Sequence, residues 1–537
     1  EDGFVTEMSY DSNYNLSTLT TPQGRTYTFT MANGYVSEIL LPNGKTLKYG
    51  YDENNNLSTF TDANGNTTTY LYDDAHRMLS YRDANGDTVN ENVYDSEGRV
   101  VKQTDGNGDV TTFEYSKGQT KTTDANGNVT VYTYDENFRT TRIDYADGTF
   151  ETKTYDDLNN LASVTDCNGT TVSYTYNANG DVTSETRKLD GAKKLYEYNS
   201  DNKLTKIVDF DSKETSFVYD ENGDLVKQIN NDGTEVTYTY NEKHQVISET
   251  DALGNTTKYT YEGLLISSVT DALGGKIEYY YDSMGNVVST VDKNGNITRF
   301  TYDSMGGKLT EQTPDGAITT NTFDKVGNVV KITDPKGYTY SFTYDPIGNM
   351  LSSTDNEGKV VTYTYDGLYN KTSETDALGN VTKYKYDCKS RVVSITDPES
   401  NVFTYSYDGV GNLLEGDNTT YTYDLRFDGA IASLKTALSN AETNEYNIVG
   451  LLEKHTAKSG AVTSYSYDKM NRLSAVSEPT GLKTSYSYDA IGNITEQTDN
   501  EGRTTKYEYD AQVSVKRTGG GVNGGLDFNL KMPLQSE

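Results

Sequence analysis

Tyrosine and threonine alternate in short segments along almost the whole chain. Residues 238–240 and 363–365, for example, both read Tyr-Thr-Tyr. A period of two predicts a β-strand with tyrosines on one face and threonines on the other, and both residue types favour strands. Segments rich in β-branched residues, such as residues 287–291 and 392–396, lie between them and are also predicted to be extended. Each unit of the chain is therefore expected to contain two short strands.

The tyrosine that precedes an aspartate or asparagine recurs at nearly constant spacing. Most steps are 21 residues long and a few are 20 or 22. The unit reads Thr-x-Tyr-x-Tyr-Asp-x-x-Gly-Asn-x-x-x-x-x-Thr-Asp-x-x-Gly-Asn, and about 24 units are expected over residues 1–510. The series is Tyr51, Tyr72, Tyr94, Tyr134, Tyr155, Tyr176, Tyr198, Tyr219, Tyr240, Tyr261, Tyr281, Tyr302, Phe323, Tyr344, Tyr365, Tyr386, Tyr407, Tyr467, Tyr488 and Tyr509.

Both turns of each unit have the form Asp-x-x-Gly. We call the one after the tyrosine the Tyr-Asp turn and the one after the threonine the Thr-Asp turn. Asp at the first position and Gly at the fourth favour a type I turn, in which the carboxylate caps backbone amides and glycine adopts a positive φ. Asn and His tolerate a positive φ, and they replace this glycine at His76, His244, Asn159, Asn202 and Asn471. Phe138 and Tyr369 occupy the same slot, and this rule does not explain them.

These elements predict an all-β protein whose core is built from tyrosine. One repeat buries too little apolar surface to offset the entropy of ordering about 21 residues. We therefore expect a single repeat not to fold alone and the stacked repeats to be stable together. About 48 strands at ~4.8 Å spacing would form a ribbon about 230 Å long, and twisted sheets of that length curl. We therefore expect a long antiparallel sheet coiled into a spiral hollow shell. An elongated β-solenoid is the alternative.

The repeat pattern weakens in two places. Tyrosine disappears from residues 425–444, within an irregular stretch around residues 425–446 in which Ile431, Leu434 and Leu438 have weak helical spacing. We interpret this stretch as a degenerate repeat or a short plug. After Asp510 the repeat stops, and residues 511–537 form a second segment with a glycine-rich part at 518–525. We interpret it as a linker or truncated junction, because the Lys-Ser/Thr pair of a phosphate-binding loop is absent.

Charge and composition restrict the possible partners. The formal net charge is −33, which argues against binding to nucleic acid or to an anionic membrane surface. No apolar run approaches the roughly 18 residues that a membrane span requires. Two cysteines in 537 residues do not constitute a disulfide framework. No charged and apolar leader precedes the repeats, so a signal peptide is expected to have been removed or to lie elsewhere in a longer protein.

The many carboxylates could serve catalysis, calcium binding or turns. Catalysis needs two carboxylates in unlike environments, whereas these aspartates occupy equivalent turn positions. Residues 62–66 and 105–109 look like calcium loops, but their glycine is at position 4 and they lack the glutamate that closes an EF-hand. His455 has no Cys or His neighbour that would complete a zinc set. We therefore predict no enzyme, no catalytic or metal-binding residue and no cofactor, and we favour the turn interpretation.

The repeat closely resembles the YD, or Rhs, repeat. The resemblance is carried by Tyr-Asp-Ser-Met-Gly-Asn at residues 281–286 and Thr-Val-Asp-Lys-Asn-Gly at residues 290–295, and it covers about residues 1–510. Such repeats occur in bacterial Rhs and wall-associated polymorphic toxins, in the cage component of insecticidal toxin complexes and in animal teneurins. The resemblance implies a hollow β-shell that encloses a toxic C-terminal segment, or in other members a surface adhesion module that sometimes binds carbohydrate.

Two departures from toxin-carrying Rhs proteins concern the end of the array. Those proteins usually close their shell with a plug ending in Asp-Pro-x-Gly, beside which they cleave themselves. Residues 345–348 have these letters but occupy an ordinary turn in the middle of the array, and nothing after Asp510 supplies a plug or a toxin domain. Self-cleavage and toxicity are therefore not predicted for this chain.

The function expected from the sequence is the structural shell of a secreted or cell-surface bacterial Rhs-type protein. Its partner would be a C-terminal toxin cargo that this chain does not contain. The alternative is a surface adhesin for glycans or another cell's proteins, which predicts clusters of solvent-facing tyrosines. A tyrosine stripe at strand period is more often a packed face, which favours the shell.

Overall fold

The computed structural model of the chain is all-β, with one long antiparallel sheet, as the sequence predicts. It describes residues 4–520 except 417, 428, 437–440 and 510–514. The first segment of each repeat forms an odd-numbered strand: β1 (Glu7–Tyr10), β3 (Thr26–Ala32), β5 (Thr46–Tyr51), β7 (Thr67–Tyr72), β9 (Thr88–Tyr94), β11 (Val110–Ser116), β13 (Val129–Tyr134), β15 (Phe150–Tyr155), β17 (Thr171–Tyr176), β19 (Lys193–Tyr198), β21 (Glu214–Tyr219), β23 (Glu235–Tyr240), β25 (Thr256–Glu262), β27 (Lys276–Tyr281), β29 (Ile297–Tyr302), β31 (Ile318–Phe323), β33 (Thr339–Tyr344), β35 (Val360–Tyr365), β37 (Val381–Tyr386), β39 (Val402–Tyr407), β41 (Thr419–Tyr423), β43 (Glu442–Tyr446), β45 (Val462–Tyr467), β47 (Lys483–Tyr488) and β49 (Thr504–Tyr509). The second segment forms an even-numbered strand: β2 (Leu16–Thr20), β4 (Tyr35–Leu40), β6 (Leu57–Thr61), β8 (Met78–Arg82), β10 (Val100–Asp105), β12 (Gln119–Thr123), β14 (Thr140–Asp144), β16 (Leu161–Thr165), β18 (Val182–Arg187), β20 (Leu204–Val208), β22 (Leu225–Ile229), β24 (Val246–Thr250), β26 (Leu265–Thr270), β28 (Val287–Val291), β30 (Lys308–Gln312), β32 (Val329–Thr333), β34 (Met350–Thr354), β36 (Lys371–Thr375), β38 (Val392–Thr396), β40 (Leu413–Gly416), β42 (Ile431–Thr436), β44 (Leu452–Thr456), β46 (Leu473–Ser477), β48 (Ile494–Thr498) and β50 (Val515–Gly520).

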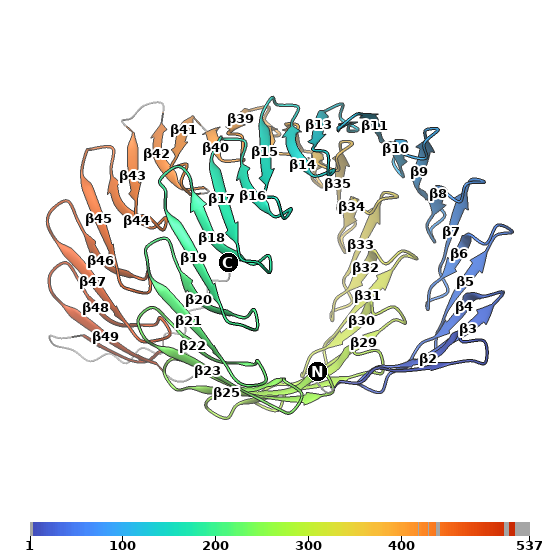
Figure 1. Cartoon of the computed structure of the whole chain (residues 1–537), viewed down its shortest axis with the longest axis horizontal. Helices are drawn as coiled ribbons and strands as arrows, with labels where there is room; N and C mark the ends of the chain where they lie inside the picture. The colour runs from blue at the N-terminus through green and yellow to red at the C-terminus, as the bar shows by residue number, and fades with distance from the viewer. Residues whose placement is uncertain (1–3, 417, 428, 437–440, 510–514, 521–537) are drawn as a thin grey trace. The chain divides into compact units, whose positions relative to one another are not determined.

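The chain divides into two compact units, each built from distant parts of the sequence. Unit 1 comprises residues 1–148, 260–269 and 276–403, and unit 2 comprises residues 149–259, 270–275 and 404–537. Within each unit, strands that are consecutive in the sequence run side by side (Figure 1). We call residues 4–148 the first pass of unit 1 and residues 276–403 its second pass. In unit 2 the first pass is residues 149–259, and the second is the described part of 404–520.

The two hairpins of a repeat differ in register. Strands β23 and β24, which flank a Tyr-Asp turn, pair Thr239 with Ser248 but Tyr240 with Val246, so that Ile247 is skipped and forms a β-bulge. Strands β22 and β23, which flank a Thr-Asp turn, pair without a shift. A bulge increases the local twist and bends a sheet. Each repeat therefore carries its bend at the Tyr-Asp end.

The turns have the geometry that the sequence predicts. In the Thr-Asp turn that begins at Asp62, Oδ1 of that residue accepts hydrogen bonds from the backbone amides of Asn64 (2.9 Å) and Asn66 (2.8 Å), while Oδ2 accepts one from the Asn66 side chain (3.0 Å). The fourth position has a positive φ whether or not it is glycine, as at His76 (62°), His244 (59°), Asn159 (70°), Asn202 (64°) and Asn471 (62°). Phe138 and Tyr369, which the sequence rule did not explain, also have φ values of 61° and 65°. The capped turn therefore imposes the conformation even on an aromatic residue.

The tyrosine face is less buried than the sequence analysis assumed. Tyrosines at the two alternating positions of β23 and β35 are half-buried, while the threonines between them are exposed. In the part of the chain that the structure describes, no large side chain is fully buried, and the buried apolar residues are Leu41, Ala192 and Ala475. The prediction of a buried tyrosine core is therefore wrong in degree. Each ring is covered mainly by its neighbours along the same sheet, because these strands form a single layer.

The tyrosine of the Tyr-Asp pair also joins successive repeats through its hydroxyl. Tyr240 donates to the carbonyl of Leu225 (2.7 Å) and Tyr302 donates to the carbonyl of Val287 (2.9 Å). In both cases the acceptor lies 15 residues earlier, at the start of the preceding even-numbered strand. Phe323 has no hydroxyl, and there the side-chain amide of Asn321 donates to the corresponding carbonyl of Lys308 (2.9 Å). The Lys308 carbonyl therefore still accepts a side-chain hydrogen bond in the repeat where phenylalanine replaces tyrosine.

The two irregular segments are strands where they are described. Ile431 and Leu434 lie in β42, which pairs with β41 and β43, so the described part of this stretch continues the sheet and their helical spacing is misleading. Leu438 lies outside the described residues. Residues 518–520 of the glycine-rich tail belong to β50, which pairs with β49, and residues 521–525 are outside the described part. The described residues include no helix that is long and apolar enough to span a membrane.

Candidate functional site: the seam between two passes

Thr-Asp turns of the first pass contact Tyr-Asp turns of the second pass inside each unit. We call this set of contacts the seam. The recurring contacts join turns that are 238 to 241 residues apart in the sequence, in unit 1 and in unit 2 alike. Further contacts reach the adjacent turn, as between Tyr369 and Asp105 (264 residues apart) and between Arg187 and Ile448 (261 residues apart). Turns that share one local geometry thus meet at a nearly constant interval of sequence.

An asparagine at the third position of the Thr-Asp turn makes the recurring seam contact. Its side chain is aimed at the opposite turn, where it accepts from the second backbone amide or donates to the capping aspartate. The contacts are Ser304 N to Asn64 Oδ1 (2.9 Å), Asn85 Nδ2 to Asp324 Oδ2 (3.3 Å), Asn107 Nδ2 to Asp345 Oδ2 (2.8 Å), Gly367 N to Asn126 Oδ1 (3.1 Å), Asn168 Nδ2 to Asp408 Oδ2 (2.9 Å) and Gly409 N to Asn168 Oδ1 (2.9 Å).

At two of the facing turns the second position must be small. A Cβ placed on Gly409 would lie 2.5 Å from the carbonyl oxygen of Cys167, and one on Gly367 would lie 2.6 Å from the Cβ of Ala125. Backbone therefore approaches backbone at the seam, and a larger residue would separate the turns. The third position of second-pass Tyr-Asp turns is mostly apolar, as at Met284, Met305, Val326, Ile347, Leu368, Val410, Val449, Met470 and Ile491.

In unit 1 one stretch of the seam gathers carboxylates. Burial, together with the nearby carboxylates of Asp105, Asp366 and Asp345, raises the pKa of Asp109. Tyr369 donates its hydroxyl to Asp105 Oδ2 (2.8 Å), and burial followed by that hydrogen bond raises the pKa of Tyr369 to about 12. Most turn aspartates with a shifted pKa behave in the opposite way; the side chain of Asn296, for instance, lowers the pKa of Asp292. The stretch thus concentrates negative charge between the two passes.

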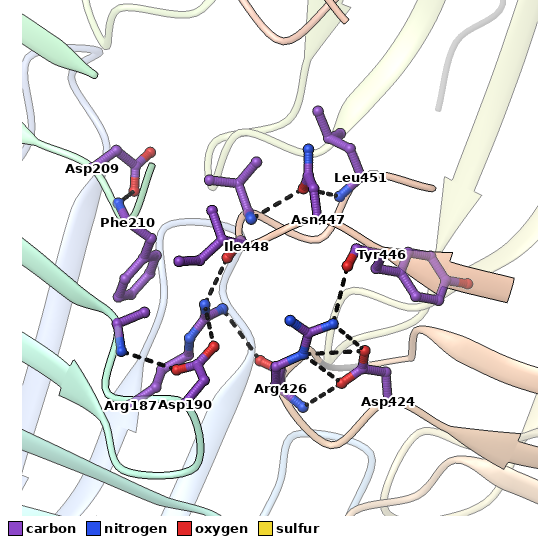
Figure 2. Close-up of polar contacts among 12 residues, drawn as sticks. Arg187, Asp190, Asp209, Phe210, Asp424, Arg426, Tyr446, Asn447, Ile448 and Leu451 are labelled. Carbon is purple, nitrogen blue, oxygen red and sulfur yellow. Dashed lines mark hydrogen bonds and ion pairs between the residues drawn. The ribbon is translucent and has the colours of Figure 1, made fainter. Parts of the chain in front are cut away.

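In unit 2 the seam contains an arginine instead. The Arg187 side chain is 7% exposed, and its Nη2 donates to Asp190 Oδ2 (2.9 Å) and to the carbonyl of Ile448 (2.6 Å), as Figure 2 shows. Its Nη1 lies 3.5 Å from the carbonyl oxygen of Arg426. The guanidinium also stacks on the rings of Phe210 and Phe427, at 4.3 Å and 4.7 Å from their centroids.

Arg426 extends this cluster within the second pass. It forms an ion pair with Asp424 (2.6 Å) and donates to the carbonyl of Tyr446 (3.0 Å), so the two arginines hold three turns together (Figure 2). A buried guanidinium that is stacked on aromatic rings and bonded to carbonyls is well suited to bridge two layers of backbone. We call Arg187, Asp190, Phe210, Arg426 and Phe427 the arginine cluster.

The residues weighed for chemistry in the sequence have structural roles in the described part of the chain. Asp105 Oδ1, in the second calcium-like loop, accepts from the amides of Asn107 (2.9 Å) and Asp109 (2.9 Å), so that oxygen caps a turn. The histidines bond to neighbouring side chains: Nδ1 of His455 lies 2.9 Å from Asn444 Oδ1. The turn at residues 345–348 belongs to the seam of unit 1, where a Cβ on Gly106 would meet Pro346 at 2.8 Å.

Exposed tyrosines are distributed rather than clustered. The most exposed ones in the described residues are Tyr10, Tyr14, Tyr35, Tyr280, Tyr338, Tyr340 and Tyr369, which come from several separate hairpins. Only two pairs among them, Tyr10 with Tyr14 and Tyr338 with Tyr340, are near one another in sequence. Sequence reasoning identified the turns but did not predict the seam. The available signal was the difference at the third turn position, which is Asn in five first-pass Thr-Asp turns and apolar in most second-pass Tyr-Asp turns.

Two family models match the chain. The teneurin YD-shell model matches residues 33–310 and 369–518, which is well over half of the chain. The RHS repeat model matches residues 323–359 and 344–381. A comparison with curated proteins gives no match.

Solved structures share the fold at low sequence identity. The crystal structure of TcdB2-TccC3 matches 95% of this chain with a TM-score of 0.62 and 14% identity. The crystal structure of TcdB2-TccC3-Cdc42 also matches 95% of the chain, with a TM-score of 0.61 and 13% identity. The chain spans only 38% and 40% of the length of these two larger chains.

Proposed function

Because the chain belongs to the teneurin YD-shell family, we propose that it is a wall segment of an Rhs-type shell that encloses a C-terminal toxin or effector. The observation that carries this proposal is the near-constant interval of 238 to 241 residues between turns that meet at the seam. A strand array that meets itself at a constant interval is what a coil with a constant turn length requires.

The interval also sets the size of such a coil. About 11 repeats per turn, with two strands each at ~4.8 Å, give a circumference of about 110 Å and a diameter near 35 Å. Strands only four to seven residues long would make each layer about 20 Å tall, so that two layers joined by a seam enclose a space large enough for a small unfolded polypeptide. The fold likeness to TcdB2-TccC3 supports the same proposal at the level of architecture.

Small-angle X-ray scattering of the chain tests the hollow architecture. A solid globule of this length has a radius of gyration near ~24 Å, and an unfolded chain near ~87 Å. We expect a value moderately above the first, with interatomic distances that peak beyond half of their maximum, because mass lies in the wall. A rod-like distance distribution would contradict the shell and favour the adhesin, which glycan-binding assays would then examine.

We also propose that the protein acts outside the cell, at the bacterial surface or after secretion. The resemblance to surface and secreted Rhs-type proteins supports this location. Fractionation of the producing cells with an antibody against the repeat array tests it, and recovery only in the cytosolic fraction would contradict it.

A further inference from the structure

One seam contact in unit 2 brings a lysine amine against a side-chain amide. Lys213 ends the Thr-Asp turn between β20 and β21, and Asn471 lies in the Tyr-Asp turn between β45 and β46. Lys213 Nζ contacts Asn471 Oδ1, although the residues are 258 positions apart in the sequence. The contact therefore joins the first pass to the second.

A carboxylate completes the group. Asp211 Oδ2 lies 2.9 Å from Lys213 Nζ, and the side chains of these residues are 14% and 26% exposed respectively. Asp211 is held in place because its Oδ1 also accepts from the backbone amide of Lys213 (3.2 Å). A fixed carboxylate beside an amine is able to take up and return a proton without moving.

Asn471 is equally well positioned. Its φ is 62°, and its backbone amide donates to the carbonyl of Asp468 (3.1 Å), which fixes the turn that projects its side chain. Its side-chain oxygen accepts from Lys213, whereas its Nδ2 donates to no group in the described part of the protein. The amide nitrogen is thus free to leave.

Other lysines in similar turn positions lack this combination. Lys389 faces the carboxylate of Asp147 (3.1 Å), and Lys203 faces the backbone carbonyl of Gly223. Neither of these contacts offers a side-chain amide as an electrophile. The amine, amide and carboxylate at Lys213, Asn471 and Asp211 form a distinct chemical group.

We propose that Lys213 and Asn471 condense into an isopeptide bond that joins the two passes covalently. Asp211 takes a proton from the Lys213 ammonium, and the resulting amine attacks Asn471 Cγ. The bond from Nζ to Cγ forms, the bond from Cγ to Nδ2 breaks, and Asp211 returns its proton to the departing nitrogen, which also receives the second proton that Nζ loses on becoming an amide. One ammonium ion leaves, so charge and atoms balance with no oxidant or added reactant.

Such a bond would close a loop of more than two hundred residues. Cross-links that close long loops restrict the unfolded chain most strongly. A covalent bond at the seam would also prevent the two passes from separating under load, which matches the wall function proposed above but does not depend on the identity of any cargo.

Mass spectrometry of the purified full-length chain tests the proposal. We expect an intact mass about 17 Da below the sequence mass, which is the mass of ammonia, and a peptide pair that carries residues 213 and 471 joined together. After limited proteolysis, the fragments that contain the two residues should migrate as one species on a denaturing gel. Lys213→Arg, which keeps the ion pair with Asp211, and Asn471→Gly, which suits the positive φ, should both abolish the joined peptide.

Further variants separate this reaction from other losses of ammonia. Asp211→Asn should leave the pair uncondensed while the sheet still forms, and Lys203→Arg should leave the joined peptide unchanged. Cyclisation at an Asn-Gly sequence, such as residues 64–65, also removes ammonia, but that loss would persist in Lys213→Arg. Recovery of Lys213 and Asn471 in separate, unmodified peptides from folded wild-type protein would overturn the proposal.

Discussion

In unit 1 one stretch of the seam runs through Asp105, Asp109, Asp345 and Asp366, whereas in unit 2 a stretch of the same kind is built around Arg187 and Arg426. Both stretches join a turn of the first pass to Tyr-Asp turns of the second pass. The first-pass turns differ in length: Gly108 N donates to the carbonyl of Asp105, three residues earlier, whereas Gly191 N donates to the carbonyl of Arg187, four residues earlier. The side chains that these turns carry have opposite charges.

The comparison indicates that side-chain charge contributes to how strongly the facing turns are held together. Like charges within a few ångströms disfavour their ionised forms, so the carboxylate stretch should weaken as its groups ionise. A guanidinium is protonated at all ordinary pH values, so the arginine cluster should depend less on pH than the carboxylate stretch does.

Arg187→Met should cost unit 2 about 3–5 kcal/mol of stability, because the change leaves Asp190 and the carbonyl of Ile448 without their buried partner. Amide hydrogen exchange followed by mass spectrometry should show faster exchange in β18 and β42, and little change in unit 1. Arg99→Met is the matched control: the Arg99 side chain is 44% exposed in its ion pair with Asp95, so its loss should destabilise the protein far less. Equal effects of the two substitutions would contradict the special role of the arginine cluster.

Asn168→Ala should cost about 2 kcal/mol, because its side chain makes two seam hydrogen bonds of 2.9 Å, one of them to the Asp408 carboxylate. Asn85→Ala removes one contact of 3.3 Å and should cost less than about 1 kcal/mol. Urea denaturation followed by tyrosine fluorescence measures both. If Asn85→Ala lowered the free energy of unfolding more than Asn168→Ala does, the hydrogen bonds of these asparagines would not be what stabilises the seam.

Sequence periodicity accounts for most of the fold. The Tyr-Thr alternation located the strands, and β28 and β38 begin and end at the residues predicted. The Asp-x-x-Gly rule predicted both turns, because turn geometry depends on four or five adjacent residues. The degree of tyrosine burial was overestimated, because alternation shows which face a residue occupies but not whether a second layer covers that face.

The seam could not be predicted in the same way. It joins residues about 240 positions apart, and no local pattern reports which repeat will face which. Asn64 and Asn168 occupy the same turn position as Asn294, a Thr-Asp position of the second pass with no seam contact among the described residues. Arg187 is likewise one charged residue among many in the sequence. Its burial follows from long-range packing, which a single sequence does not reveal.

Asp109→Asn should stabilise unit 1 at neutral pH by no more than about 1 kcal/mol, since water screens part of the repulsion. The pKa of Asp109 is raised in the folded protein above its ordinary value of 3.8, so the folded state binds this proton more tightly than the unfolded state does. Its favourable contribution is therefore complete below about pH 4 and is lost as pH rises through the folded pKa. Urea midpoints measured between pH 4 and 7 should fall less with rising pH in Asp109→Asn than in the wild type.

Asp292→Asn is a control in which the pH dependence of stability has the opposite sign, because the hydrogen bond from Asn296 lowers the pKa of Asp292. That carboxylate stabilises the folded state above pH 4 and loses its contribution as pH falls through its folded pKa. If both variants shifted the pH dependence in the same direction, the carboxylate cluster would not be its cause.

The smallest effect compares two aromatic residues with the same backbone conformation. Phe138→Gly should stabilise the protein by about 0.5 kcal/mol, because it relieves a positive φ of 61° at a side chain that is 88% exposed. Tyr369→Gly relieves a similar φ of 65° but removes the hydroxyl that donates to Asp105 across the seam of unit 1. Thermal unfolding should therefore show a higher midpoint for Phe138→Gly and no gain for Tyr369→Gly. An equal gain in both variants would mean that the Tyr369 hydroxyl contributes nothing, and that the carboxylate stretch is held together by its backbone turns alone.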